Sequence, residues 1–368
     1  MTYRPLSAVV LAAGEGTRMK SSRPKPLHLL CGRPMLLHVL DALAELPIER
    51  AVVVVGHGAE WVTKTLQEQG PPDLVIDFVE QHVPRGTGDA VSVALTAFPD
   101  DDFVDGDIVV LPGDTPLMRP PTLAALVRQH RQTDAAATLL TAHLDQPTGY
   151  GRVVRGRDDH VSRIVEEVDA TPEERAIEEV GTSIYCFRRS LLAPALRRLS
   201  PENAQGEYYL TDVVGVLSDA GYPVATLLAD DPMETAGVND RAQLAVAEAE
   251  LRDRTNERWM RFGVTMLDPE RTYIDASVRL AVDVTLFPGT MLQGHTVVGP
   301  GAQIGPDTRL VDCAVGEGAV VEQTVGRDAE IGADAVVGPF ASLPPGTVVP
   351  PGARTGAFYT ATRGDEGA

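Results

Sequence analysis

Short apolar segments alternate with amphipathic segments along roughly the first 240 residues of the chain. Five segments are rich in β-branched or small apolar residues and predict strands: Ser7–Ala13, Ala51–Gly56, Leu74–Val79, Ile108–Leu111 and Ala136–Ala142. The intervening segments predict helices: Met35–Leu43, Val62–Gln69, Asp89–Ala97 and Pro121–His130. Strands that alternate with helices predict an α/β domain with a mostly parallel sheet covered on both faces.

A single longer helix follows, from Asp240 to about Phe262. Its predicted apolar stripe consists of Leu244, Ala247, Leu251 and Phe262, and charged residues fill the other positions. Gly263 is a plausible helix cap. The pattern predicts a first domain over residues 1–240, a connecting helix over 241–263 and a second domain over 264–368.

The last hundred residues or so have a different period. Apolar residues occur six positions apart, and after a slip near Val315 the period resumes: Ile274, Leu280, Leu286, Leu292, Val298, Ile304, Leu310, and then Val325, Ile331, Val337, Leu343 and Val349. Glycine often follows directly. A six-residue period with small residues at the corners predicts a parallel β-helix, in which the apolar side chains point into a narrow prism. Unrelated hairpins are the alternative, and they would not hold one register over so many positions.

Composition limits the classes of partner. The 368-residue chain has a formal net charge of −20, which disfavours nucleic acid and anionic membranes as partners. Small anionic substrates stay compatible, because a local group of Lys and Arg can reverse the field. Cys31, Cys186 and Cys313 lie far apart and suggest neither a metal site nor a disulfide framework. With no signal-peptide pattern and no bilayer-length apolar run, we expect a cytoplasmic protein.

The first predicted strand leads into a glycine-rich loop with two cations. Gly14 and Gly16 would let backbone N–H groups approach a phosphate, and Arg18 and Lys25 could clamp a triphosphate. Transfer of a phosphoryl or nucleotidyl group needs such positioning and charge neutralisation. The loop matches neither the P-loop pattern nor the Gly-x-Gly-x-x-Gly dinucleotide pattern. On spacing alone, solvated surface charges are an equally good interpretation of Arg18 and Lys25.

The segment from Leu11 to Met19, followed by Pro24-Lys25, resembles the opening of the sugar-nucleotide pyrophosphorylases. Later segments follow in the order of one family: Gln81 with Gly86–Ala90, Gly113-Asp114, Gly149–Arg152, Ile164–Glu167, Gln205–Asp212 and Gly237–Asn239. They resemble, more narrowly, the bacterial bifunctional N-acetylglucosamine-1-phosphate uridyltransferase/glucosamine-1-phosphate acetyltransferase family. This resemblance implies a Rossmann-like nucleotidyltransferase domain followed by a left-handed parallel β-helix. It also implies cytoplasmic homotrimers, formed through the β-helix, that act in UDP-N-acetylglucosamine and peptidoglycan synthesis.

The resemblance implies a set of site residues. Arg18 and Lys25 correspond to catalytic residues, and Asp114 and Asn239 to the ligands of a Mg²⁺ cofactor. Gln81 and Gly86-Thr87 match the uracil-reading segment, and Gly151 and Glu166 lie in the segments that hold the sugar. The full expected substrate-binding set is Leu11, Ala12, Ala13, Gly14, Gln81, Gly86, Thr87, Asp114, Gly151, Glu166, Gly181 and Asn239. One carboxylate, one amide oxygen, phosphate oxygens and waters suit Mg²⁺.

The implied reaction is Mg-assisted in-line displacement, in which a hexose 1-phosphate attacks the α-phosphorus of UTP and pyrophosphate leaves. Thymidylyl or another nucleotidyl transfer to a different hexose 1-phosphate is an alternative. A non-catalytic subunit that binds sugar nucleotides is a second alternative.

Four positions depart from the family pattern. Pro112 stands where the family has Tyr before Gly-Asp, and Gly181 stands where it has the Asn of the sugar pocket. The sugar is therefore open. In the β-helix, Pro344 and Thr362 replace an expected Arg and Lys, and the coils expected to carry acetyl transfer are missing before Ala368. We therefore expect a shortened β-helix without acetyltransferase activity.

Overall fold

The computed structural model describes residues 4–98, 105–156 and 159–361. Its residues form two compact units. The first comprises Met1–His28 with Pro34–Leu244, and the second comprises Leu29–Arg33 with Ala245–Ala368. Thr362, one of the four departures from the family pattern, lies outside the described residues. The predicted division into 1–240, 241–263 and 264–368 stays a prediction.

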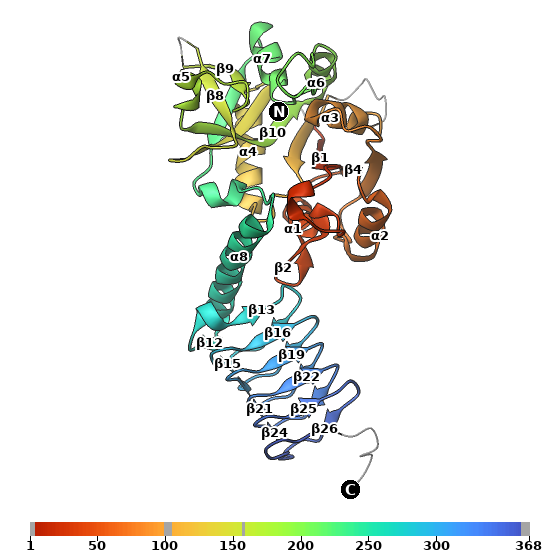
Figure 1. Cartoon of the computed structure of the whole chain (residues 1–368), viewed down its shortest axis with the longest axis vertical. Helices are drawn as coiled ribbons and strands as arrows, with labels where there is room; N and C mark the ends of the chain where they lie inside the picture. The colour runs from red at the N-terminus through yellow and green to blue at the C-terminus, as the bar shows by residue number, and fades with distance from the viewer. Residues whose placement is uncertain (1–3, 99–104, 157–158, 362–368) are drawn as a thin grey trace. The chain divides into compact units, whose positions relative to one another are not determined.

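A twisted sheet runs through the first unit (Figure 1). Among the described residues its strand order is β11-β7-β10-β6-β1-β4-β5, and β8 and β9 extend it from β10. The strands are β1 (Leu6–Ala12), β4 (Arg50–Val55), β5 (Ile76–Glu80), β6 (Asp107–Pro112), β7 (Ala137–His143), β8 (Gly151–Arg155), β9 (Val161–Val165), β10 (Glu179–Arg188) and β11 (Val224–Leu228). The five predicted strands are confirmed. β1 pairs in parallel with β4 and β6, whereas β10 runs antiparallel to β6, β7 and β8.

Helices cover both faces of this sheet, as predicted. Val10 faces a core cluster completed by α1, α2 and α4, and its neighbour Val9 faces a second cluster completed by α3, α6 and α7. Successive strand residues point to opposite faces, so both faces of β1 are apolar. The helices are α1 (Met35–Ala44), α2 (Ala59–Gln69), α3 (Thr87–Leu95), α4 (Pro120–Gln132), α5 (Pro172–Arg175), α6 (Arg189–Leu196) and α7 (Asp212–Asp219). The first unit also contains the short elements η1 (Thr17–Met19), η2 (Lys25–Leu27) and η3 (Pro232–Thr235). β2 (Leu29–Leu30) belongs to the second unit, and β3 (Arg33–Pro34) has one residue in each.

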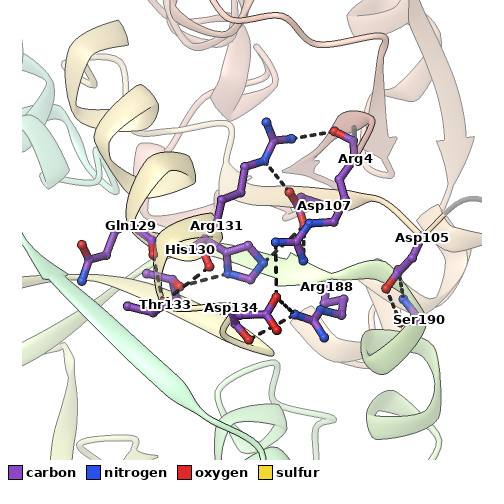
Figure 2. A network of polar contacts seen from close by, with 11 residues as sticks. Arg4, Asp105, Asp107, Gln129, His130, Arg131, Thr133, Asp134, Arg188 and Ser190 are labelled. Carbon is purple, nitrogen blue, oxygen red and sulfur yellow. Dashed lines mark hydrogen bonds and ion pairs between the residues drawn. The ribbon is translucent and has the colours of Figure 1, made fainter. Parts of the chain in front are cut away.

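A buried polar network fixes the amino end of β6 (Figure 2). Arg131 Nε donates to Asp107 Oδ2 at 2.7 Å, and His130 Nε2 lies 3.5 Å from Oδ1. Burial would raise the pKa of Asp107, but contacts with His130 and Arg131 and the charge of Arg4 outweigh it and lower the pKa. This end of β6 is therefore held firmly, and the opposite end leads to Asp114.

The helix α8 (Arg241–Phe262), whose residues from Ala245 on belong to the second unit, ends as expected, with Gly263 at a φ of 110°. The predicted stripe is wrong at Phe262, which is 54% exposed, whereas Trp259 is 8% exposed. Trp259 takes the inward position in the last turn, and Phe262 packs edge-on against its ring from outside. Asn256 is buried as well, and its amide donates to the carbonyls of Pro269 and Thr272.

The described part of the second unit contains a left-handed parallel β-helix built from three five-stranded parallel sheets (Figure 1). One sheet contains β12 (Thr265–Met266), β15 (Thr285–Leu286), β18 (Gln303–Ile304), β21 (Val320–Val321) and β24 (Val336–Val337). The next contains β13 (Tyr273–Ile274), β16 (Met291–Gln293), β19 (Arg309–Val311), β22 (Val325–Arg327) and β25 (Ser342–Leu343). The third contains β14 (Arg279–Leu280), β17 (Val297–Val298), β20 (Ala314–Val315), β23 (Glu330–Ile331) and β26 (Val348–Val349), and η4 (Pro269–Arg271) precedes them in the chain.

The predicted inward positions are buried, with one exception. Val325 is 59% exposed, and its neighbour Gly326 is the inward residue of β22. Gly326 pairs with Leu310 of the preceding coil. The coil from Leu310 to Gly326 is shorter than the coils before and after it, so the inward position falls one residue later than the six-residue period predicts. The side chains of Leu310 and Cys313 occupy the space beside Gly326.

Within the described ranges, no helix combines the length and the apolar character needed to cross a bilayer. Cys31, Cys186 and Cys313 are buried thiols without a disulfide. Burial raises the pKa of the Cys186 thiol well above its usual range, which makes it a poor nucleophile.

The shifted register can be tested with two matched substitutions. Val321 is fully buried and Val325 is largely exposed, so Val321→Ala is expected to lower the free energy of unfolding by about 2 kcal/mol. Val325→Ala should change it by less than about 0.5 kcal/mol. Urea unfolding followed by circular dichroism measures both. Equal losses in the two variants would contradict the shifted register.

Candidate active site

The loop after β1 leaves room for a ligand at one glycine and needs the other for its own shape. A side chain at Gly14 would meet no atom within 4 Å. Gly16 has a φ of 62°, and a Cβ there would lie 2.5 Å from the Cβ of Lys25. Gly14 therefore offers an open backbone surface, whereas Gly16 allows Lys25 to pack over the loop. The other loop residues predicted to bind substrate, Leu11, Ala12 and Ala13, lie at the carboxyl end of β1 and just beyond it.

Four predicted site residues meet at one point. The Lys25 ammonium donates to Asp114 Oδ2, and to Asn239 Oδ1 at 2.8 Å. Arg18 also donates to Asn239 Oδ1, at 2.9 Å. Lys25 and Asp114 side chains are 14% and 23% exposed, so their charges attract each other in a partly dehydrated setting.

Backbone contacts bring Asn239 beside Asp114, although the two are far apart in the sequence. The Val238 N–H donates to the Asp114 carbonyl at 2.9 Å. The Asn239 N–H donates to Gln243 Oε1 at 2.7 Å, which fixes the residue at the start of the next helix. Burial and the charge of Asp114 raise the pKa of the Tyr150 hydroxyl, which places the turn before Gly151 in the same neighbourhood.

The oxygens of Asp114 and Asn239 suit a hard divalent cation. They converge on a single cationic group, the Lys25 ammonium, which shows that both can serve one positive centre. Among the described residues, no three His, Cys, Asp or Glu side chains form a metal cluster. A cation held here would therefore draw its other ligands from phosphates and water, as Mg²⁺ commonly does.

Gly151, Glu166 and Gly181 form a second group. Gly151 of β8 pairs directly with Gly181 of β10, and a Cβ at Gly151 would lie 3.5 Å from Glu166 Oε2. The Thr211 hydroxyl donates to Glu166 Oε1 at 3.0 Å. Burial raises the pKa of Glu166, and the charge of Asp212 adds to the rise, while the Thr211 hydrogen bond opposes it. A partly dehydrated carboxylate beside two glycines can accept hydrogen bonds from sugar hydroxyls.

The predicted base-reading segment forms the third group, at the end of β5. Gln81 Nε2 donates to the Gly86 carbonyl at 3.2 Å and to Asp89 Oδ2 at 2.8 Å. The Thr87 hydroxyl accepts from the Leu210 N–H at 3.0 Å. Since Leu210 precedes Thr211, the Gln205–Asp212 segment joins the base-reading group to the sugar group.

The first and third groups lie at the carboxyl ends of β1, β5 and β6, where open α/β sheets bind their ligands. The second group lies on β8 and β10 and just after β9. Three residues that complete the groups lie in the segments that carry the resemblance but were not among the predicted site residues: Tyr150, Thr211 and Asp89. A hydroxyl or carboxylate that forms a hydrogen bond with another side chain leaves no periodic pattern in the sequence. Pro112, one of the departures, ends β6, and its carbonyl accepts from the Thr115 hydroxyl at 3.0 Å.

A family model described as nucleotidyl transferase matches residues 7–260. The chain is 49% identical over 329 residues to a protein of Thermobifida fusca, which covers 89% of this chain and 67% of that protein. It is 48% identical over 325 residues to a protein of Desulfitobacterium hafniense, with 88% and 69% covered. A Geobacillus relative is 45% identical over 324 residues, again with 88% and 69% covered. All three are named Bifunctional protein GlmU.

The chain belongs to the nucleotidyl transferase family. Within that family it groups with the bacterial bifunctional GlmU proteins. It is a sugar-1-phosphate nucleotidyltransferase, as the sequence predicted. The two cations, the carboxylate and the amide oxygen described above lie within the matched residues.

The two loop glycines should respond differently to alanine. Gly16→Ala is expected to lower stability by about 1–2 kcal/mol, because its backbone is left-handed and Lys25 is in the way. Gly14→Ala should leave stability within about 0.5 kcal/mol, yet raise the KM for the nucleotide about tenfold or more by blocking close approach of a phosphate. Thermal unfolding and steady-state kinetics separate the effects. A normal KM in Gly14→Ala would exclude the backbone of Gly14 from nucleotide binding.

The raised pKa of Glu166 predicts a pH-dependent stability difference. The folded-state pKa exceeds the ordinary value of 4.5, so ionisation favours the unfolded chain and stability falls as the pH rises above 4.5. The substitution Glu166→Gln removes this pH-dependent loss of stability, and the new amide oxygen can still accept the hydrogen bond from the Thr211 hydroxyl. The variant should therefore gain stability relative to the unmodified protein between about pH 4 and neutrality. Denaturant unfolding at several pH values measures the difference. A difference that stays constant with pH would contradict the burial of this charge.

Proposed function

We propose that the protein transfers a uridylyl group from UTP to N-acetylglucosamine 1-phosphate or a related hexose 1-phosphate, releasing pyrophosphate. The convergence of Arg18, Lys25, Asp114 and Asn239 carries this proposal. Such transfer needs neutralisation of crowded phosphates and correct alignment, and no nucleophilic side chain.

Arg18 and Lys25 would bind the β- and γ-phosphates of the nucleotide and stabilise the leaving pyrophosphate. Gly14 supplies backbone at which the phosphates can come close. Asp114 and Asn239 would hold Mg²⁺, which supplies charge neutralisation at the reacting phosphates. Because Lys25 contacts both predicted ligands, its charge also stabilises their arrangement.

Glu166 and Gly151 would bind the sugar beside this centre. Glu166 accepts hydrogen bonds from sugar hydroxyls, and Thr211 holds one of its oxygens in place. The glycine pair Gly151 and Gly181 presents no side chain on the facing positions of β8 and β10. Gly181 offers no amide to a sugar substituent, so the choice between an N-acetylated sugar and another hexose stays part of the proposal.

Gln81, with Gly86 and Thr87, would read the base and favour a pyrimidine. Thymidylyl transfer is the second candidate, since thymine presents the same hydrogen-bonding edge as uracil. We place the enzyme in the cytoplasm, in line with its three unpaired, buried thiols.

The β-helix would act as the contact surface of a homotrimer. We retain the prediction that acetyl transfer is lacking. It is supported within the described β-helix by Pro344, which forms a turn after β25 at a position where an Arg was expected.

Pyrophosphate release tests the proposed function. Purified protein with UTP and Mg²⁺ is compared on N-acetylglucosamine 1-phosphate, glucose 1-phosphate and glucosamine 1-phosphate, and at least one sugar should be turned over. Asp114→Ala should lower kcat/KM at least a hundredfold and weaken binding of Mn²⁺ measured by electron paramagnetic resonance. No pyrophosphate with any of the sugars would refute the proposal, and preference for ATP would refute the base assignment.

A further inference from the structure

The side-chain amide of Gln81 can point in only one direction. Its Nε2 group donates both hydrogens, to Asp89 Oδ2 at 2.8 Å and to the Gly86 carbonyl at 3.2 Å. Both partners are oxygens that only accept. A reversed amide would put Oε1 against two oxygens, so the network excludes it.

Asp89 is held in turn by a second donor. Arg85 NH2 donates to Asp89 Oδ1 at 2.8 Å, so each oxygen of this carboxylate faces a different donor. The Asp89 side chain is 11% exposed and the Arg85 side chain 61% exposed. Asp89 is therefore the inner member of the pair and can hold Gln81, which is itself buried.

The fixed amide leaves Gln81 Oε1 as a hydrogen-bond acceptor. No described residue donates to it, nor does any accept from the backbone N–H groups of Gly86 and Thr87 at the start of α3. An acceptor beside donors complements a base edge with an imino N–H next to a carbonyl. Uracil and thymine present that edge, whereas cytosine presents an acceptor nitrogen next to an amino group.

We propose that Asp89 is a specificity-determining positioning residue, which orients Gln81 so that the site accepts uracil-type bases and rejects cytosine. The inference rests on the proposed base-reading role of Gln81, and it adds which residue sets the orientation of the Gln81 amide. Asp89 itself contacts Gln81 and Arg85, and acts on the base only through Gln81.

Replacing Asp89 by its amide tests this directly. In Asp89→Asn only one oxygen remains, and the charged Arg85 is the stronger competitor for it. The new amide nitrogen then faces Gln81, whose amide must turn and present Nε2 to the base. The preference for UTP over CTP is expected to fall about tenfold or more.

Two further variants control for a loss of folding. Arg85→Ala keeps the carboxylate, so it should keep the preference for UTP. The double variant Arg85→Ala/Asp89→Asn frees the remaining oxygen to face Gln81, so it should regain most of the preference. Recovery in a protein with two substitutions cannot come from general damage to the fold.

Binding of UTP and CTP is measured by calorimetry with Mg²⁺, alongside pyrophosphate release. Unchanged selectivity in Asp89→Asn, or a double variant no more selective than the single one, would overturn the inference. An unmodified protein that binds UTP no better than CTP would overturn it too. Selective binding of UTP without any turnover would instead leave the role of Asp89 standing and refute the proposed function.

Discussion

The contact of Lys25 with Asp114 and Asn239 connects three distant parts of the first unit. Lys25 follows β1, Asp114 follows β6, and Asn239 comes at the end of the unit, 214 positions after Lys25. Opposite charges in a partly dehydrated place attract strongly, but only if the backbone brings them together. The parallel pairing of β1 with β6 does so for the first two, and the hydrogen bond from Val238 to Asp114 does so for the third.

This local group places two cations together in an acidic molecule. A formal net charge of −20 repels nucleotides at long range. Screening by salt confines that repulsion to about 8–10 Å under ordinary conditions. Arg18 and Lys25 supply positive charge beside the proposed phosphate site, and the Asp114 carboxylate offsets part of it. The acidic surface and an anionic substrate are therefore compatible.

The sequence was informative where a pattern repeats or where a motif fixes several residues together. The strands from Ser7 to Ala142 and the six-residue period were predictable, because burial imposes a regular spacing. The predictions that Val325 and Phe262 face inward were wrong, because one shortened coil and one helix end changed the register locally.

Motif segments did not reveal which contacts some of their residues make. Asp89 and Thr211 make their contacts with Gln81 and Glu166 through the tertiary fold. The antiparallel strand β10 was not predicted either, although it carries Gly181 and reaches across to β8. These features depend on which segments meet in space, and single-sequence patterns do not encode that.

The β-helix pairs each strand only with the strands one coil before and one coil after it, as β19 pairs with β16 and β22. A change in length by a whole coil would therefore preserve every remaining neighbour relation. A change by one residue between strands moves the inward position by one, and at Gly326 the chain still pairs in register with the inward Leu310 and Leu343 of the neighbouring coils. Length in this part of the molecule can thus vary during evolution in modular steps, while the chemistry in the first unit stays constant.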